Sequence, residues 1–233
     1  MDAESHVTVG AIMPTYNQAE FIAAAIDSVA PQVDSLVVVN DGGQNIEHLI
    51  DGATVHVCHL ENLGTAEAIN TGLRMMYRKV EWLTWVSSDN TYVPHWMETL
   101  KAQIAPDVGV IYSGFWYEKP GRKPLVLSTP YDPTRLIADQ NCFFGPSFII
   151  RADVWQPHRG RISHDYDNWL RVEEACWERD LRIVGVDADL CAYNAHDQRV
   201  TVTRKHLYDV PKWRADGKAR RARMAADCAE VAS

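Results

Sequence analysis

The alternation of strands and helices in the first half of the chain limits the possible folds more than any other feature. Four short apolar runs have the length of strands, at residues 7–13, 36–39, 55–58 and 82–86. The run at 36–39 is apolar without a polar alternation, which is typical of a strand buried on both faces of a parallel sheet. Helical segments are predicted between these runs. This order predicts an α/β fold with a doubly wound, mostly parallel sheet.

Two of the intervening helices have signals of their own. Asn17 followed by Glu20 three residues later is typical of an N-cap, so a helix is predicted to begin there. A second helix is predicted after Gly64, where apolar residues recur at helical spacing at Ile69, Leu73, Met76 and Val80.

The second half of the chain is less regular. A strand is predicted at 108–112, loops at 114–124, and a Gly-Pro turn followed by a strand at 142–151. A helix is predicted at 165–179, short strands at 183–186 and 190–193, and an Ala- and Arg-rich helix at 212–230. No repeat and no linker divides the chain, and 233 residues suit one α/β domain with appended elements.

Charge is distributed unevenly. The net charge is −8, but residues 204–224 carry eight basic and two acidic side chains, a net +6 that leaves −14 for the rest. An acidic body argues against a nucleic-acid partner, which requires a basic face. The basic tail would either form a solvated helix, which we favour, or contact anionic lipid, a partner or a second copy in a homodimer.

Cysteine usage bears on the compartment. The five cysteines are odd in number and have no CxxC spacing, which argues against a disulfide framework or a zinc site. The start of the chain is acidic, so we expect no secretion signal, and no apolar run approaches the roughly 20 residues that span a bilayer. These features predict a cytoplasmic protein, with peripheral membrane contact through the tail as an option.

Short polar clusters follow three of the predicted strands. They are Pro14-Thr15-Tyr16-Asn17, Asn40-Asp41-Gly42-Gly43 and Ser87-Ser88-Asp89-Asn90. In open α/β sheets, ligands bind beyond the carboxyl ends of the strands. The three clusters are therefore predicted to meet at one ligand site.

These segments resemble motifs of the inverting glycosyltransferases of family 2. Pro14–Asn17 is similar to the P-x-Y-N of that family, 39–43 to its V-D-D-G-S, and Asn62-Leu63-Gly64 with Asn70 and Gly72 to its N-x-G…A-x-N-x-G helix. Residues 86–90 fall at its D-x-D, 145–151 resemble its G-x-x-x-x-x-R strand, 164–171 its E-D-x-D-L-x-L-R helix start, and 193–199 its Y-x-x-H segment. Seven motifs in the family's order cover about residues 7–201.

The resemblance implies a GT-A fold, with a small acceptor-side region and a C-terminal helix. A single glycosyltransferase domain would span 1–204. Its nucleotide-sugar-binding half would cover about 1–113 and its acceptor-binding half about 114–204, with a basic helical tail at 205–233.

Three positions depart from the family's motifs. Ser87 replaces the first Asp of D-x-D, Asn40 replaces the first Asp of V-D-D-G-S, and His164 replaces the Glu before the presumed base. Metal binding would then rest on Asp89 with fewer carboxylates.

The resemblance implies that a sugar moves from a nucleotide-diphosphate donor to a hydroxyl of a glycan, lipid-linked, protein or small-molecule acceptor. Tyr16 would pack against the nucleobase and Asp41 would accept a hydrogen bond from a ring N–H. The alternatives are a core aromatic for Tyr16 and turn chemistry for Asp41. The donor site would comprise Pro14, Tyr16, Asn17, Asn40, Asp41, Asn62, Gly64 and Ser88.

A divalent cation, Mn²⁺ or Mg²⁺, would be held by Asp89 and His196, because such ions take one or two carboxylates together with substrate phosphates. The alternatives are that the polar cluster at 87–90 caps a helix after Pro94, and that His196 is a surface residue.

Asp165 is the predicted general base, at a helix N-terminus that favours its charged form. Asp167 is the rival, and His164 would tune the base or contact the acceptor. Either carboxylate could instead belong only to the helix start. Two other functions are weighed against glycosyl transfer. A nucleotidyltransferase would carry Gly and basic residues after the first strand, and PTYNQAE has neither. A non-catalytic sugar-nucleotide-binding protein is favoured by Ser87 and Asn40.

Overall fold

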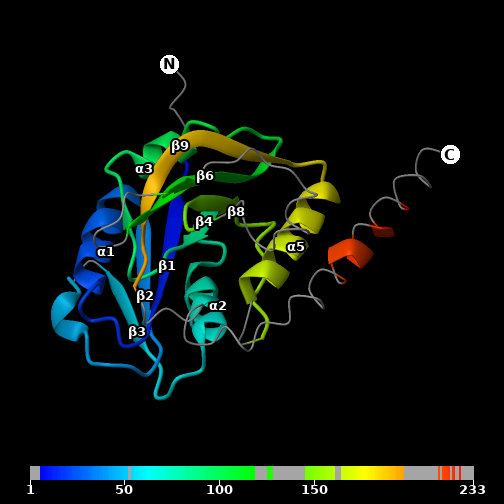
Figure 1. The fold of residues 1–233 in the computed structure, drawn as a ribbon. Helices are drawn as coiled ribbons and strands as arrows, with labels where there is room; N and C mark the ends of the chain where they lie inside the picture. Colours follow the sequence, from blue (N-terminus) through cyan, green and yellow to red (C-terminus); the bar gives the residue numbers. More distant parts are fainter. Residues whose placement is uncertain are drawn as a thin grey trace.

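The computed structural model describes residues 6–51, 54–118, 125–127, 145–160 and 164–196, with positions 215, 217–220, 222–223 and 226 of the C-terminal segment. One mixed sheet runs through the described part, in the order β3-β2-β1-β4-β8-β6-β9-β5, with β7 paired to β6 (Figure 1). The strands are β1 (Val9–Thr15), β2 (Ser35–Asn40), β3 (Val55–Cys58), β4 (Trp82–Trp85), β5 (Thr91–Tyr92), β6 (Val108–Glu118), β7 (Leu125–Leu127), β8 (Phe148–Arg151) and β9 (Arg182–Asn194).

The four strands β3, β2, β1 and β4 are parallel neighbours, as the alternation in the sequence predicts. Strand β8 enters antiparallel between β4 and β6, and β6 then runs parallel to β9. The carboxyl ends of β1, β2 and β4 therefore share one edge of the sheet, together with the ends of β6 and β9.

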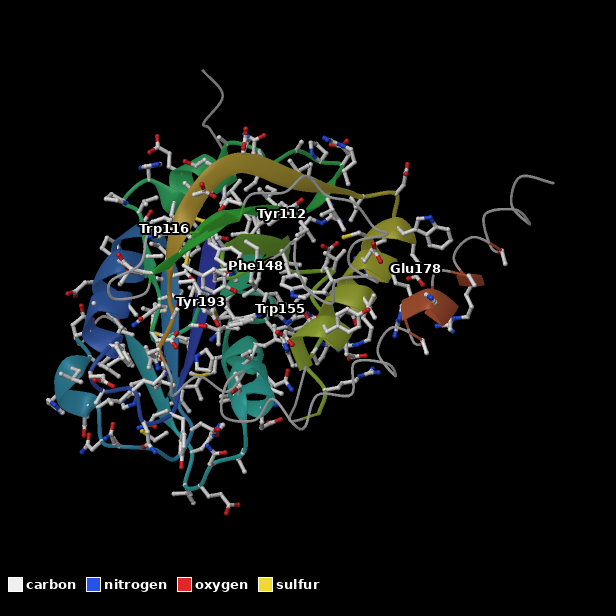
Figure 2. All side chains as sticks on the ribbon, in the orientation of Figure 1. Tyr112, Trp116, Phe148, Trp155, Glu178 and Tyr193 are labelled. Carbon is white, nitrogen blue, oxygen red and sulfur yellow. The ribbon has the colours of Figure 1, made fainter. Side chains whose placement is uncertain are left out.

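Helices cover both faces of this sheet. Helices α1 (Ile22–Val29) and α3 (Trp96–Lys101) pack on one face, and α2 (Thr65–Met76) and α5 (His164–Trp177) on the other (Figure 1). Two apolar cores result, one on each side of the sheet. Phe148 and Trp155 belong to the core beneath α5, where Phe148 meets the Trp169 ring edge to face at 4.7 Å (Figure 2).

The C-terminal half is more regular than the sequence suggests. Residues 114–118, predicted as loop, continue β6, and the predicted strands at 183–186 and 190–193 form the single long strand β9. Strands β6 and β9 pair with each other along almost their whole length, with register shifts around Gly114. Mutual pairing thus overrides the local Gly and Asp signals. The rest of the predicted loop at 119–124 lies outside the described residues.

The predicted N-cap at Asn17 is wrong. Helix α1 begins at Ile22, and its N-cap residue, Phe21, makes no side-chain capping bond. Asn17 instead has a positive φ of 55° and accepts a hydrogen bond from the Gln44 N–H at 2.9 Å. The Asn17 side chain therefore links the loop after β1 to the loop after β2 instead of capping a helix. Val80 also lies beyond its predicted helix, because α2 ends at Met76.

The described positions of the C-terminal segment are helical, as predicted for this region. Gly217 is buried, and Arg220 forms an ion pair with Glu174 of α5. In Figure 1 this segment lies beside α5. At least part of the basic tail is therefore docked on the domain.

The described cysteines are free. Cys58 is exposed, while Cys176 and Cys191 are buried. Burial raises the pKa of Cys176 to about 12, so that its thiol stays protonated and packs as an apolar group. Cys142 and Cys228 lie outside the described residues. No helix in the described part is long and apolar enough to cross a bilayer.

Gly72 sets how closely α2 approaches β1. A Cβ atom at this position would lie 2.4 Å from Cγ2 of Ile12, a fully buried side chain of β1. Replacing Gly72 with Ala should therefore destabilise the protein by about 1–3 kcal/mol through overpacking, more than the roughly 0.5–1 kcal/mol of helix propensity gained. Urea denaturation measures the change, with Glu98→Ala on exposed α3 surface as the control. A Gly72→Ala protein as stable as the parent would contradict this packing.

Candidate active site

The polar clusters after β1, β2 and β4 lie together, as the strand order requires. Asp41 N–H donates to the Thr15 carbonyl at 2.9 Å, and Val86 N–H donates to the Ile12 carbonyl at 2.9 Å. These bonds extend the sheet just past the strands and set the three loops side by side. Pro14 itself lies buried within β1, in register with Val39 of β2.

Asp89 is the centre of a contact network. Its Oδ2 atom accepts a hydrogen bond from Nε2 of Gln18 at 3.2 Å and lies 2.9 Å from Nε2 of His196. Ser88, which is buried, donates its hydroxyl to Oε1 of Gln18. The two predicted metal ligands, 107 residues apart in sequence, are therefore direct neighbours.

The position of His196 is fixed by β9 and the loop that follows β4. Asn90, fully buried, accepts the Asn194 N–H through its side-chain oxygen at 3.2 Å. The His196 ring stacks on Phe21 with centroids 4.9 Å apart, and its side chain is 14% exposed. His196 is thus not the surface residue that its polar sequence context allows.

The helix-cap alternative for residues 87–90 is excluded by the course of the chain. Strand β5 follows the cluster, and α3 begins only at Trp96, with His95 at its N-cap. Tyr92 of β5 donates its hydroxyl to the Pro146 carbonyl at 2.8 Å. Burial raises the pKa of Tyr92, so this hydroxyl stays neutral and acts as an anchor beneath the cluster.

Asp41 holds the loop between β3 and α2. Its Oδ1 atom accepts the Leu63 N–H at 3.0 Å and lies 2.7 Å from Nδ1 of His59, and its Oδ2 atom accepts the Gly64 N–H at 2.8 Å. The residue is 3% exposed. An ionised carboxylate has about four acceptor positions, so these three bonds leave one on Oδ2 for a further donor. Asp41 therefore organises more than its own Asp-Gly turn.

His59 connects that carboxylate to α2. Its Nε2 atom lies 3.0 Å from the hydroxyl of Thr71, which accepts from Arg74 at 2.7 Å. The His59 tautomer with its proton on Nδ1 forms both hydrogen bonds, because Nδ1–H donates to Asp41 and the Thr71 hydroxyl donates to Nε2. His59 had no motif to mark it in the sequence. Only its place directly after β3 hinted at the site.

The remaining donor-site candidates surround the Gly42-Gly43 turn. Asn40 shapes this turn, donating to the Gln44 carbonyl at 2.8 Å and accepting the Gly43 N–H at 3.0 Å. A Cβ on Gly43 would lie 2.8 Å from the Asn17 nitrogen. A Cβ on Gly42, at φ 73°, would lie 2.5 Å from the Glu61 carbonyl carbon, so only glycine fits between the loops.

Tyr16 and the loop at 60–64 provide apolar surface beside this turn. Tyr16 is 46% exposed, so it is not a core aromatic, and Leu63 is 40% exposed. Asn62 is half-buried, and Gly64 adopts a φ of 97° at the start of α2. Tyr16 therefore exposes apolar surface beside Gly43, where a Cβ atom would lie 3.2 Å from its ring.

Asp165 and Asp167 lie in the first turn of α5 with different partners. Asp167 forms an ion pair with Arg171, with Oδ2 2.8 Å from Nε. Asp165 is half-buried, and its Oδ1 accepts the Tyr166 N–H at 3.0 Å. His164 is the first residue of α5, and its side chain does not belong to the described part of the structure. Among the described residues, Asp167 is the one of these two carboxylates that forms an ion pair.

The start of α5 is tied to α2 through the segment before it. Asn70 of α2 exchanges two hydrogen bonds with the His158 backbone, at 2.9 and 2.8 Å. Arg171 then donates to the Pro157 carbonyl at 2.6 Å, and Asn168 to that of Gln156. In Figure 1 the first turns of α5 point toward the end of the molecule where β1–β3 finish. No contact joins Asp165 directly to the Asp89 network in the described part.

Gln18 is the main site residue that sequence reasoning missed. It appeared only as part of a predicted helix start, yet its amide contacts both Ser88 and Asp89. Gln18 directly follows the polar cluster Pro14–Asn17 at the end of a central strand, and this position is the signal that could have identified it. Among the described residues no three His, Cys, Asp or Glu side chains gather as a metal cluster. Beside the Asp89–His196 pair lies the side-chain amide of Gln18.

The sheet order, with helices on both faces, is that of the GT-A fold. A solved structure of S. aureus TarS 1–349 in complex with UDP-GlcNAc has a TM-score of 0.66 at 15% identity, covering 91% of this chain and 66% of that one. Glucosyl-3-phosphoglycerate synthase from Mycobacterium tuberculosis, in complex with Mn²⁺, UDP-Glc and phosphoglyceric acid, has a TM-score of 0.60 at 15% identity, covering 90% and 80%. At such identities the likeness shows the shared fold.

Residues 11–164, about two thirds of the chain, match the model of glycosyl transferase family 2. The chain belongs to this family. An uncharacterised glycosyltransferase of Rickettsia typhi is 27% identical over 209 residues, and one of Rickettsia prowazekii is 27% identical over 194. These matches cover 75% and 70% of this chain, which spans 62% and 58% of those relatives.

Proposed function

We propose that this chain is an inverting glycosyltransferase that moves a sugar from a nucleotide-diphosphate sugar to a hydroxyl acceptor, with a divalent cation at Asp89 and Asp165 as general base. The observation that carries the proposal is the 2.9 Å contact between Asp89, after β4, and His196, after β9. Two segments far apart in sequence bring a carboxylate and an imidazole together at the carboxyl edge of the sheet.

The donor is proposed to be a UDP-sugar. Complexes of the structural neighbours contain UDP-GlcNAc in one case and UDP-Glc in the other, which supports this choice. The base would stack on Tyr16, and the unused acceptor position on Asp41 Oδ2 would take a ring N–H. Asn17, Asn40, Asn62 and Gly64 would hold the loops in place around it.

The residues around Asp89 fit a divalent cation. The Asp89 carboxylate oxygen Oδ2 lies 2.9 Å from the His196 imidazole nitrogen and 3.2 Å from the Gln18 amide nitrogen. Mg²⁺ or Mn²⁺ needs only one or two carboxylates beside substrate phosphates. When bound, such an ion neutralises charge on the leaving diphosphate. Ser87 in place of Asp does not prevent this, because the diphosphate supplies further oxygens.

Asp165 is preferred over Asp167 as the base because Arg171 occupies the Asp167 carboxylate. Asp165 lies in the first turn of α5 and its carboxylate accepts the Tyr166 N–H at 3.0 Å, which orients it. It would remove the acceptor proton as the oxygen attacks the sugar from the face opposite the diphosphate, which inverts the anomeric centre. The acceptor is proposed to be a hydroxyl of a glycan, lipid-linked molecule, protein or small molecule.

A second function remains in competition, a sugar-nucleotide-binding protein without transfer activity. Ser87 and Asn40, which replace acidic residues of the family's motifs, favour it. It predicts nucleotide binding without turnover. Slow Mn²⁺-dependent hydrolysis of the bound sugar nucleotide, with water as acceptor, separates the enzyme from the binder.

The test is thermal denaturation with UDP, GDP, dTDP and CDP sugars, each with and without Mn²⁺. A ligand at 100 times its Kd should stabilise the fold by roughly 2.7 kcal/mol, and we expect UDP-sugars to do so only with Mn²⁺ present. UDP release from the stabilising donor is then followed over time. Failure of every donor to raise Tm would refute donor binding, and stabilisation without any UDP release would support the binder.

A further inference from the structure

The amide of Gln18 contacts the two residues that follow Ser87, the position where the family motif has its first Asp. Family motifs place two carboxylates at D-x-D, whereas this chain has Ser87, Ser88 and only Asp89. In the structure Gln18, from the loop after β1, reaches across to both Ser88 and Asp89. Its side chain is half-buried, so it lines the site instead of extending into solvent.

The orientation of this amide suits a site without a cation. Its NH₂ group points to the Asp89 carboxylate at 3.2 Å, and its oxygen accepts from Ser88. The amide N–H therefore offsets part of the carboxylate charge. A cation arriving at Asp89 would meet this N–H group unless the amide turned.

Such a turn keeps the contact of the amide with Ser88 and gives up its N–H bond to Asp89, which the cation would replace. A half rotation of the terminal amide exchanges its oxygen and nitrogen, and rotation about this sp³–sp² bond is broad and roughly two-fold. Ser88 can follow, because a hydroxyl donates or accepts equally well. After the turn the amide NH₂ donates to the Ser88 oxygen, and the carbonyl oxygen points toward Asp89. No hydrogen bond of the amide to Ser88 is lost.

We propose that Gln18 supplies a neutral oxygen ligand to the divalent cation, in place of the carboxylate missing from this chain, and that Ser88 permits the amide rotation which presents it. This inference rests on the proposed metal-dependent function. Carbonyl oxygens suit Mg²⁺ and Mn²⁺ as ligands. Asp89, His196 and Gln18 then form a three-residue protein ligand set drawn from the ends of β4, β9 and β1.

The test is Mn²⁺ binding in the presence of saturating UDP, followed by the electron paramagnetic resonance signal of free Mn²⁺. Gln18→Met keeps the length of the side chain but removes the oxygen, and we expect it to raise the Kd for Mn²⁺ at least about 10-fold. Gln18→Glu restores an oxygen and a charge, and should bind Mn²⁺ at least as tightly as the parent. Gln103→Met, exposed after α3, is the matched control and should bind as the parent does.

Other outcomes overturn the inference in distinguishable ways. If Gln18 only orients Asp89 by donating an N–H, neither Met nor Glu can replace it and both variants lose affinity. If Gln18→Met binds Mn²⁺ as the parent does, Gln18 is no ligand, although metal-dependent transfer stands. If the parent protein binds no Mn²⁺ with UDP, the metal step of the proposed function fails as well.

A crystal structure of the parent with Mn²⁺ and UDP gives a direct second readout, which does not depend on the folding of any variant. The Gln18 oxygen should lie within about 2.3 Å of the ion, as in other oxygen-ligand sites of hard cations. An amide whose nitrogen still faces Asp89 in that complex would overturn the proposal.

Discussion

Replacing Asp165 with asparagine is expected to lower kcat by about 10²–10⁴-fold, the usual contribution of a positioned general base. Asparagine keeps the shape of the side chain and its bond to the Tyr166 N–H, but it cannot take a proton. Binding of UDP with Mn²⁺ should stay unchanged, because no contact joins Asp165 to the Asp89 network within the described part of the chain. The measurements are UDP release from the stabilising donor and UDP affinity by calorimetry.

The neighbouring carboxylate provides the control. Asp167→Asn removes an exposed partner of Arg171 and should change kcat by no more than a few-fold. A protein in which Asp167→Asn abolishes turnover while Asp165→Asn leaves it intact would assign the base to the second position of the motif instead of the first.

Asp89→Asn is expected to have the second large effect, a loss of about 10³-fold or more in kcat/KM together with the loss of measurable Mn²⁺ binding. In the described part of the chain, Asp89 is the carboxylate that contacts both Gln18 and His196, so its loss removes the negative charge from this network. The free Mn²⁺ signal in the presence of UDP and the rate of UDP release check the two parts of this prediction.

Asp27→Asn is the matched control for Asp89, since it removes an exposed carboxylate of α1 without touching the site. It should retain both Mn²⁺ affinity and turnover. Full activity of Asp89→Asn in the presence of a chelator would refute a role for the cation altogether.

The sequence predicts those parts of the fold where local pattern and tertiary environment agree. The apolar run at 36–39 is the buried parallel strand β2, and the periodic residues after Gly64 form α2. Strand β2 buries its whole apolar run, and α2 buries Ile69 and Met76 with Leu73 half-buried. The α/β class and the meeting of three polar loops follow from these elements and the strand order.

Prediction fails where long-range pairing decides the outcome. Gly114 and the Asp residues at 187 and 189 are typical of turns, but β6 and β9 pair through them because each strand satisfies the backbone of the other. Asn17 has the residue type of a cap, yet its left-handed backbone turns the chain toward Gln44. In both cases the partner is remote in sequence and leaves no local signal.

The candidate site is predicted unevenly for the same reason. The family motifs predict Asp89 and His196 as a pair, and the two side chains lie in contact. Gln18 and His59 belong to no motif and reach Asp89 and Asp41 only through the fold. Residue type at one position does not reveal that an amide reaches a carboxylate 71 residues away. The assignments of Asp165 and of the donor-site residues remain predictions for the variants described above.

The insertion of β8 between β4 and β6 has a practical consequence for engineering. A four-residue piece of the later sequence closes the exposed edge of the earlier strands, and the boundary predicted at 113/114 falls inside β6. The halves are thus interleaved in space and cannot be exchanged by one crossover. A chimera that imports another acceptor region would have to retain the native Phe148–Arg151 segment, or replace it with one matched to Trp82 and Leu83.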